Sequence, residues 1–317
     1  MDDLAERIRS AIENPNNDPW WPGLTDELAA TEWVRLRREI GLVPDTYGTN
    51  RLLGRNISAR RDIIRFLKTP PSSVVRTIAL EALSSEWVRH YNKVGVSFYT
   101  PQEILNSRVL TCLEEAILIV NQVPGLMRTV ASLVRSLHVI KPEDQDHDVS
   151  FSEPNVPFSI FVSVPEKRIA NDALRVAEAI VHEAMHLQLT IIEQVVPVTV
   201  SLSKKYYSPW RRELRDARGI IHALYVFTVI DRFLAQISSN MSQRLPAKHV
   251  RRRRREINMQ INNTASFQTS SELTFLGAQL VQSLIYSSRF SLRCSKVFRT
   301  LPNSSSTSLT EFLSPDS

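Results

Sequence analysis

Residues 177–186 of the chain read AEAIVHEAMH, and the prediction of the fold starts from this stretch. Apolar residues continue at helical spacing on both sides of it, which predicts one long helix that begins after Asn171 as its N-cap and ends near Val195. His182 and His186 are four residues apart, so a helix places them on one face, about 6 Å apart along its axis. The stretch therefore predicts a helix with two imidazoles directed to the same side.

Further helices are predicted on both sides of this segment from apolar periodicity, capping residues and proline positions. Thr100 and Glu103 form a capping box, with Pro101 at the first helical position. The predicted helices cover residues 26–40, 72–88 (capped at Ser72 or Ser73), 100–123 and 126–137 before the stretch, and 219–237, 247–261 and 271–287 after it.

The best predicted strand covers residues 158–164, FSIFVSV, because β-branched and aromatic residues fill it and prolines flank it. Residues 138–140 are a second candidate, and the polar segment 141–157 is typical of a loop. We therefore expect a mainly α fold with a small β element, in which a helical N-terminal region packs on a core built around the HExxH helix. The expected regions are a helical N-terminal region at 1–137, a metal-binding catalytic region at 138–300 and a disordered tail at 301–317.

Composition limits the class of protein. Of the 317 residues 43% are hydrophobic, enough for a packed core, and only 8 are glycine, which argues against a turn-rich all-β fold. No apolar run is expected to reach the roughly 18 to 20 residues that cross a bilayer, and the acidic N-terminus lacks a signal-peptide layout. Cys112 and Cys294 do not suggest a disulfide framework. We expect a reduced, cytoplasmic protein without a membrane segment.

The formal net charge is +6, and residues 251–255 are all arginine. Such a run can bind nucleic acid by releasing counterions. However, it falls inside the predicted helix 247–261, so its arginines point around the helix axis, and no aromatic residues alternate with them to stack on bases. A solvated helix face is the favoured interpretation, with no nucleic-acid partner and the oligomeric state left open.

The two histidines of the long helix predict a metal site. Neutral imidazoles at this spacing can converge on one ion, and the pattern is that of zinc metalloproteases, in which the intervening glutamate, here Glu183, activates the metal-bound water. Burying these groups in an apolar helix would be costly without a purpose. The third ligand is expected to be His222, on the next apolar helix, or Glu193, which is rather far along the axis. The remaining histidines are expected to be structural: His90, His138, His147 and His249.

Several segments taken together resemble one known family. They are PFSIFVS (157–163), AEAIVHEAMH (177–186), YYSPWR (206–211) and GIIHALYVF (219–227), with a weaker match at Glu272-Leu273-Thr274 and Gly277. The arrangement resembles the HExxH-motif peptide-modification family, also described as 2-oxoglutarate-dependent HExxH-type peptide β-hydroxylases, which accompany gene clusters for ribosomally made, modified peptides. The resemblance covers about residues 139–284, and YYSPWR is its most specific part.

The resemblance implies a non-haem iron(II) oxygenase. With 2-oxoglutarate as co-substrate, it would hydroxylate a side-chain carbon, the β-carbon by the family's description, in a precursor peptide. Matched by position, His182, His186 and His222 would bind Fe(II), with Glu183 as a catalytic residue. Because the familiar iron oxygenase site uses two histidines and a carboxylate, Glu193 and Glu183 stay open as alternatives to His222.

The co-substrate has a distal carboxylate, which an arginine neutralises best through two parallel hydrogen bonds. Arg211, in the matching motif, is the candidate, with Arg212 as a substitute and Tyr207 as a hydroxyl donor. The alternative for Arg211 is a surface ion pair with Glu213 or Asp216.

The peptide would lie near the strand 158–164, as an added strand at an open sheet edge. The main alternative is a zinc metallopeptidase that uses His182 and His186, with Glu183 as general base. Arg211 has no evident role in a peptidase. A third interpretation is a binding protein without catalysis, using the helical N-terminal half or the arginine-rich helix.

Overall fold

The computed structural model describes residues 2–14, 17–40, 62–68, 77–144, 149–153, 158–240 and 247–297. The chain is mostly helical, with a mixed six-stranded sheet and a small two-stranded hairpin, so the predicted fold class is confirmed. The predicted tail, the predicted caps Ser72 and Ser73, and His147 lie outside the described residues.

The six-stranded sheet has the order β1-β2-β4-β6-β5, with β3 paired to the end of β4. Neighbours β2, β4 and β6 run parallel, whereas β1 and β5 are antiparallel strands at the two edges. The strands are β1 (Asp62–Lys68), β2 (Thr77–Ala82), β3 (Ser97–Phe98), β4 (Ser136–Lys141), β5 (Ser150–Phe151) and β6 (Ser159–Ser163).

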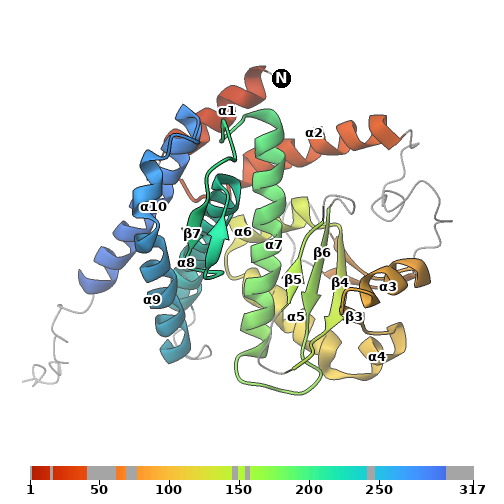
Figure 1. The fold of residues 1–317 in the computed structure, drawn as a ribbon. Coiled ribbons are helices and arrows are strands. Elements are labelled where there is room, and N and C mark those ends of the chain that lie inside the picture. The colour runs from red at the N-terminus through yellow and green to blue at the C-terminus, as the bar shows by residue number, and fades with distance from the viewer. Residues whose placement is uncertain are drawn as a thin grey trace, which may run out of the picture.

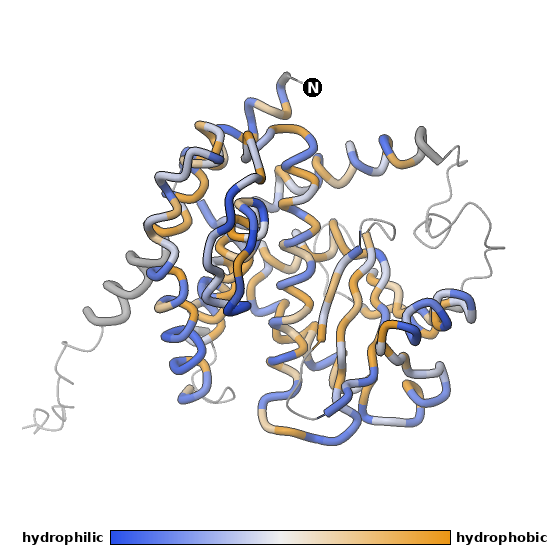
Figure 2. The backbone as a smooth tube through the Cα atoms, viewed as in Figure 1, coloured by the Kyte–Doolittle hydropathy of each residue, from blue (hydrophilic) through white to orange (hydrophobic). Residues whose placement is uncertain are grey.

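Helix α7 (Asp172–Val195) carries the two histidines and stands between the sheet and helices α8, α9 and α10 (Figure 1). Ile160 and Val162 of β6 belong to the main apolar core shared with α7, whereas Phe161 belongs to a second cluster on the other side of the sheet. Figure 2 shows the hydrophobic segments gathered along α7 and the central strands. The side chains of β6 alternate between the two faces of the sheet because a strand has a period of two residues.

Most of the other helices pack around α7, with α5, α6 and α8 in direct contact with it. Their bounds are α1 (Asp2–Glu13), α2 (Pro22–Ile40), α3 (Ser85–Asn92), α4 (Pro101–Asn106), α5 (Arg108–Val120), α6 (Pro124–Leu133), α8 (Ala217–Asn240), α9 (Ala247–Asn263) and α10 (Phe275–Val297), with a short 3-10 helix at Ala265–Thr269. The hairpin between α7 and α8 consists of β7 (Tyr206–Ser208) and β8 (Glu213–Arg215).

Three predicted helices in the N-terminal half were wrong in part. The segment expected as a helix over 72–88 contains strand β2, and α3 begins only after Ser84, which caps it. The helix expected over 100–123 starts with the predicted capping box but breaks at Ser107, which caps a separate helix α5. The helix expected over 126–137 ends at Leu133, because the chain enters β4. Pairing with other strands, which local periodicity does not report, decides the first and third of these segments, whereas the break at Ser107 involves no strand.

The strand predicted at 158–164 is confirmed as β6, but it is not an edge strand. β4 pairs with one side of β6 and β5 with the other, so the edge belongs to β5. β5 lies inside the segment predicted as a loop, and its two residues give no alternating pattern to detect. The expected boundary between residues 137 and 138 falls within β4.

Helix α8 corrects the expectation that no apolar run is long enough to cross a membrane. Its segment Ala217–Ser239 is long and apolar enough to cross a membrane by length and composition, contrary to the sequence-based expectation. However, 72% of its most apolar window is buried inside the protein. Apolar residues on all sides of this helix are accounted for by contacts with α7, α9 and α10.

Candidate metal centre

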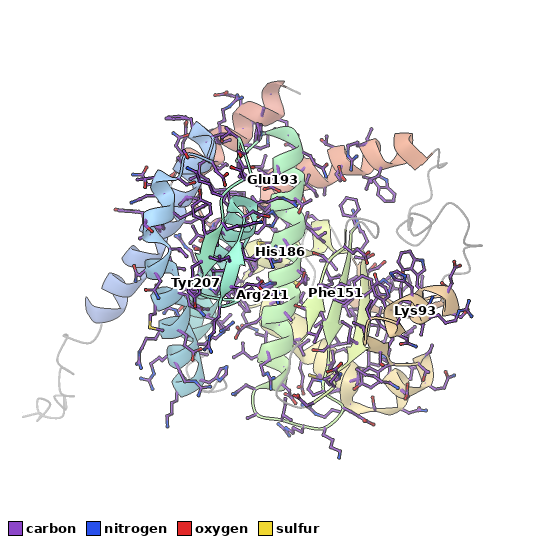
Figure 3. The ribbon with its side chains drawn as sticks, in the orientation of Figure 1. Lys93, Phe151, His186, Glu193, Tyr207 and Arg211 are labelled. Atoms are coloured by element: carbon purple, nitrogen blue, oxygen red, sulfur yellow. The ribbon has the colours of Figure 1, made fainter. Side chains whose placement is uncertain are left out.

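The three histidines predicted as ligands lie in one row across the contact between α7 and α8. Nε2 of His186 lies 3.1 Å from Nε2 of His182, one turn earlier on α7. Nδ1 of His186 lies 3.0 Å from Nδ1 of His222 on α8, and these two rings stack with centroids 5.3 Å apart. Figure 3 shows His186 on the face of α7 directed away from the sheet. The structure therefore brings together residues that are 36 positions apart in the sequence.

Glu193 fixes the orientation of His222. Its Oε2 lies 3.1 Å from Nε2 of His222 and accepts a 2.8 Å hydrogen bond from Nε of Arg218. A carboxylate accepts, so His222 donates through Nε2 and presents the lone pair of Nδ1 to His186. This is the arrangement by which an outer carboxylate orients a metal-binding histidine. Glu193, predicted as an alternative ligand, thus contacts His222 through its carboxylate.

His182 and His186 are half-buried, and their surroundings keep both imidazoles neutral. Burial, with the charges of Arg211 and Arg253, lowers the pKa of His182 to about 4. Burial also lowers the pKa of His186 well below its usual range, and the neighbouring His182 and His222 lower it further. Neutral imidazoles keep the lone pairs that bind metal ions.

Glu183 is buried on the sheet side of the same helix. Its Oε1 accepts a 2.7 Å hydrogen bond from Ser150 of the edge strand β5 and lies 3.9 Å from Nε2 of His182. Burial raises the pKa of Glu183 to about 7, although hydrogen bonds from Ser150 and Ser152 lower it. The carboxylate thus links the edge strand to the histidine row.

Donor chemistry and spacing test whether these residues fit a metal ion. Two nitrogens bound to one ion at about 2.1 Å are about 3.0 Å apart at a right angle and about 3.4 Å apart at the tetrahedral angle, so each of the 3.0 and 3.1 Å separations suits a right-angled pair. However, within the described ranges no set of three or more His, Cys, Asp and Glu side chains is arranged to hold an ion as it stands. His186 turns a different nitrogen toward each neighbour, so the three rings do not face one ion in this arrangement. The residues therefore fit a metal ion in donor chemistry and in pairwise spacing, but not in their joint arrangement.

The hairpin brings Arg211 to the site. Ser208 and Arg212 close its turn, because the amide of Arg212 donates a 2.7 Å hydrogen bond to the Ser208 carbonyl and its φ is 57°. Arg211 is exposed at this turn, and its charge acts on His182 and His186. Figure 3 shows Arg211 on the hairpin beside α7.

The alternative expected for Arg211, a surface ion pair, is not formed. Glu213 pairs with Arg215, and Asp216 lies 4.0 Å from Lys205. Among the described residues Arg211 has no ion-pair partner. Its guanidinium is therefore available to an anion.

An aromatic layer that the sequence-based reasoning missed supports His182. Phe227 of α8 packs edge-on against His182 with centroids 5.4 Å apart, and Trp210 of the hairpin stacks on Phe227 at 5.3 Å. Arg253 of α9 lies over Phe227 at 5.7 Å and pairs with Glu178 at 3.0 Å. Trp210 and Phe227 stand in the matching motifs, but their mutual contact has no signal in one sequence.

The segment that leads into the hairpin is fastened to the start of α10. Oε1 of Glu272 accepts hydrogen bonds from Ser203 Oγ and from the amide of Lys204, both at 2.7 Å. Gly277 lies so close to this segment that a Cβ would stand 1.9 Å from the carbonyl oxygen of Val198. Glu272 and Gly277, the weaker part of the family motif, therefore have a structural role in holding the segment before Arg211.

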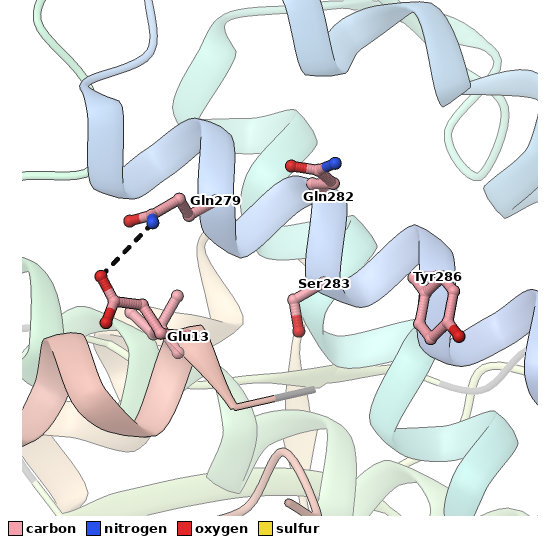
Figure 4. Close-up of a pocket in the computed structure, with 6 residues that line it drawn as sticks. Glu13, Gln279, Gln282, Ser283 and Tyr286 are labelled. Atoms are coloured by element: carbon pink, nitrogen blue, oxygen red, sulfur yellow. Dashed lines mark hydrogen bonds between the residues drawn. The ribbon is translucent and has the colours of Figure 1, made fainter. Parts of the chain in front are cut away.

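A separate hollow between α1 and α10 contains none of the predicted site residues (Figure 4). Across it, Nε2 of Gln279 donates a 3.3 Å hydrogen bond to Oε1 of Glu13. It is lined by Ile12, Glu13, Gln279, Gln282, Ser283 and Tyr286.

No protein-family model and no curated protein sequence matches this chain. The family resemblance therefore rests on the motifs and their order alone.

Proposed function

We propose that the chain is an iron(II)- and 2-oxoglutarate-dependent hydroxylase that modifies a side-chain carbon of a ribosomally made peptide. One observation carries this proposal: Arg211, without an ion-pair partner in the described chain, lies close enough to a row of three imidazoles to lower the pKa of two of them, His182 and His186. A metallopeptidase needs the metal-binding imidazoles but not the arginine. An enzyme whose co-substrate has a distal carboxylate needs both.

His182, His186 and His222 are the proposed holders of the metal. Iron(II), when bound, supplies the oxidising chemistry, in which one oxygen atom of O2 enters the peptide and the other enters succinate, with release of CO2. Glu193 keeps His222 in the tautomer whose Nδ1 lone pair is free. The apolar residues of α7 and α8 exclude water from the far side of the row.

Arg211 is the proposed partner of the distal carboxylate of 2-oxoglutarate. A guanidinium offers two parallel N–H groups to a carboxylate, and exposure at the hairpin turn lets the co-substrate reach it. Tyr207, 60% exposed on the same hairpin, is the proposed hydroxyl donor.

The edge strand β5 is the proposed place for the peptide, in place of the inner strand β6. An extended chain can add to an open edge through backbone hydrogen bonds. Ser150 of β5 already contacts Glu183, so a strand added there would pass beside the histidine row. Glu183 is then the group that meets the peptide backbone or the bound water.

The test combines metal analysis of anaerobically purified protein with succinate release. Iron bound in one equivalent, and 2-oxoglutarate consumed only when iron and oxygen are present, are the expected results. His182→Ala should lose both, with an unchanged circular dichroism spectrum, whereas His90→Ala on α3 should keep both. No succinate release from iron-loaded protein, even uncoupled from a peptide, would contradict the proposal.

Zinc peptidase activity is the second candidate, because Glu183 lies 3.9 Å from Nε2 of His182, near a water that a metal would hold there. Cleavage of unstructured peptides by the zinc-loaded protein, lost in Glu183→Gln with metal retained, would favour it.

A further inference from the structure

Two segments of the described chain carry a large excess of positive charge. Residues 204–218 hold six lysines and arginines against two acidic residues, and residues 247–256 hold six against one. The formal net charge is +6, so the rest of the chain is net acidic. One segment is the hairpin with its flanks, and the other is most of α9.

These two segments meet at Phe227, beside the histidine row. Trp210 of the hairpin stacks on its ring with planes only 3° apart, and the guanidinium of Arg253 lies 5.7 Å from its centroid. His182 packs edge-on against the same ring. In Figure 2 the hairpin and much of α9 are hydrophilic. The concentration of charge thus borders the candidate metal centre.

The arginines of α9 divide into two groups with different roles. Arg253 and Arg254 point inward and pair with Glu178 and Asp231 at 3.0 and 2.9 Å, which fastens α9 to α7 and α8. The exposed cations form a second group with the spacing i, i+3, i+4, i+7, which is one helix face. This group is Lys248, Arg251, Arg252 and Arg255.

The exposed group has no ion-pair partner in the described chain, and neither have Arg211 and Arg212 on the hairpin. The interpretation of residues 251–255 as a uniformly solvated face is therefore correct only for the outer arginines. Arg211 is assigned to the co-substrate, so we call the exposed stripe of α9 together with Arg212 of the hairpin the basic surface.

We propose that the basic surface docks an acidic segment of the peptide substrate, so that the modified residue lies at the histidine row. This proposal rests on the proposed function for the identity of the substrate, and it adds its chemical class: an aspartate- and glutamate-rich flank. Opposite charges on the two partners steer association and fix register.

An acidic peptide fits this surface better than a nucleic acid does. Glu213 and Glu256 are exposed within it and interrupt the positive charge. A peptide can place neutral residues opposite them, whereas every linkage of a nucleic acid carries a phosphate. Met259 is the next exposed side chain along the stripe of α9, so within the described residues of α9 no exposed aromatic ring accompanies the arginines to stack on bases. The hairpin offers one exposed ring, that of Tyr207.

The test measures binding by fluorescence anisotropy with a labelled glutamate-rich peptide and its counterpart in which every glutamate is glutamine. Neither metal nor 2-oxoglutarate is added, so failure of hydroxylation leaves this measurement valid. We expect binding only of the acidic peptide, weakening as salt increases. The triple variant Arg251→Gln, Arg252→Gln, Arg255→Gln should bind roughly tenfold more weakly, since each exposed pair contributes a factor of about two or three.

The matched control removes three exposed cations elsewhere: Arg89→Gln, Lys93→Gln and Lys167→Gln. Figure 3 shows Lys93 far from Arg211. The control should bind as the wild type does. Equal binding of the two peptides, no binding of either, or equal losses in both triple variants would overturn the proposal. So would a single-stranded DNA that binds more tightly than the acidic peptide at the same salt. If the triple variant does not fold, Arg252→Gln alone serves, with an expected loss of about twofold to threefold.

Discussion

The hydroxyl of Tyr225 on α8 lies 2.5 Å from Oε1 of Gln188 on α7 and 2.6 Å from the carbonyl oxygen of Pro19. Gln188 in turn donates from Nε2 to the carbonyl of Trp20 at 2.9 Å. All of these contacts are buried, and they lie two residues after His186 and three after His222. The N-terminal segment thus joins the two helices whose separation sets the spacing of the histidine row.

Removing the Tyr225 hydroxyl should weaken the contact between α7, α8 and the N-terminal segment. The single hydroxyl proton lies between two buried acceptors, so Tyr225→Phe leaves at least one of them, on Gln188 or Pro19, without its donor, which costs about 1 to 3 kcal/mol of unfolding free energy. Metal affinity should fall as well, because α7 and α8 lose their common anchor. Urea unfolding and titration with Co(II) measure the two effects. Tyr286→Phe, at a position 58% exposed, is the control and should change neither. Unchanged stability in Tyr225→Phe would contradict the assigned role.

The carboxylate of Glu193 should matter for metal affinity although it is not among the proposed ligands. Glu193→Gln removes the charge that orients His222, and outer-carboxylate losses typically cost about tenfold to hundredfold in affinity. Competition with a chromogenic chelator measures this. A complete loss of metal in Glu193→Gln, equal to that in His222→Ala, would indicate instead that Glu193 is itself a ligand.

Arg211 should bind the co-substrate through the two parallel N–H groups of its guanidinium and not through its charge alone. Arg211→Lys keeps the charge but loses one of two parallel hydrogen bonds, so the KM for 2-oxoglutarate should rise about tenfold. The neighbouring change Arg212→Lys should leave KM unchanged. Initial rates of succinate release across a 2-oxoglutarate series provide the measurement, and equal KM increases in both variants would refute the assignment.

Gly277 should tolerate no side chain. In Gly277→Ala the new Cβ would stand 1.9 Å from the Val198 carbonyl oxygen, so backbone must shift, at a cost of about 1 to 3 kcal/mol. At Gly23 a Cβ meets nothing within 4 Å, and Gly23→Ala in α2 should keep or slightly raise stability. Thermal unfolding of the two variants checks this. Equal melting temperatures would show that the segment before the hairpin adapts easily.

His138 should make the protein sensitive to mild acid. It is fully buried in β4, where burial lowers its pKa to about 4. In the unfolded chain its pKa is about 6.5, so protons bind preferentially to the unfolded state as pH falls below that value. The stability that neutral His138 contributes is complete above pH 6.5 and is lost progressively as the pH falls to about 4. The total loss is roughly 3 kcal/mol of unfolding free energy.

His138→Leu should flatten this part of the curve of unfolding free energy against pH, whatever its effect at neutral pH. His90→Leu, at an exposed position on α3, should leave the slope as in the wild type. Chemical unfolding at a series of pH values measures both, and identical slopes in the wild type and His138→Leu would rule out this source of acid sensitivity.

Local sequence signals determined several elements correctly, and each has a local cause. The Thr100–Glu103 capping box, the inner strand near Phe161 and the histidine helix ending at Val195 all follow from contacts within a few residues. The placement of both α7 histidines on one side of their helix needs only the helical repeat.

Tertiary structure decided the rest, because the decisive partners are distant in the sequence. Strand β2 replaced an expected helix since β1 and β4 pair with it, and β5 became the edge because β6 pairs on both sides. The link from Glu193 to His222 and the contact of Arg253 with Phe227 depend on how α7, α8 and α9 pack. A sequence fixes which imidazoles share a helix face, but only packing brings the third one and the charges that surround it within reach.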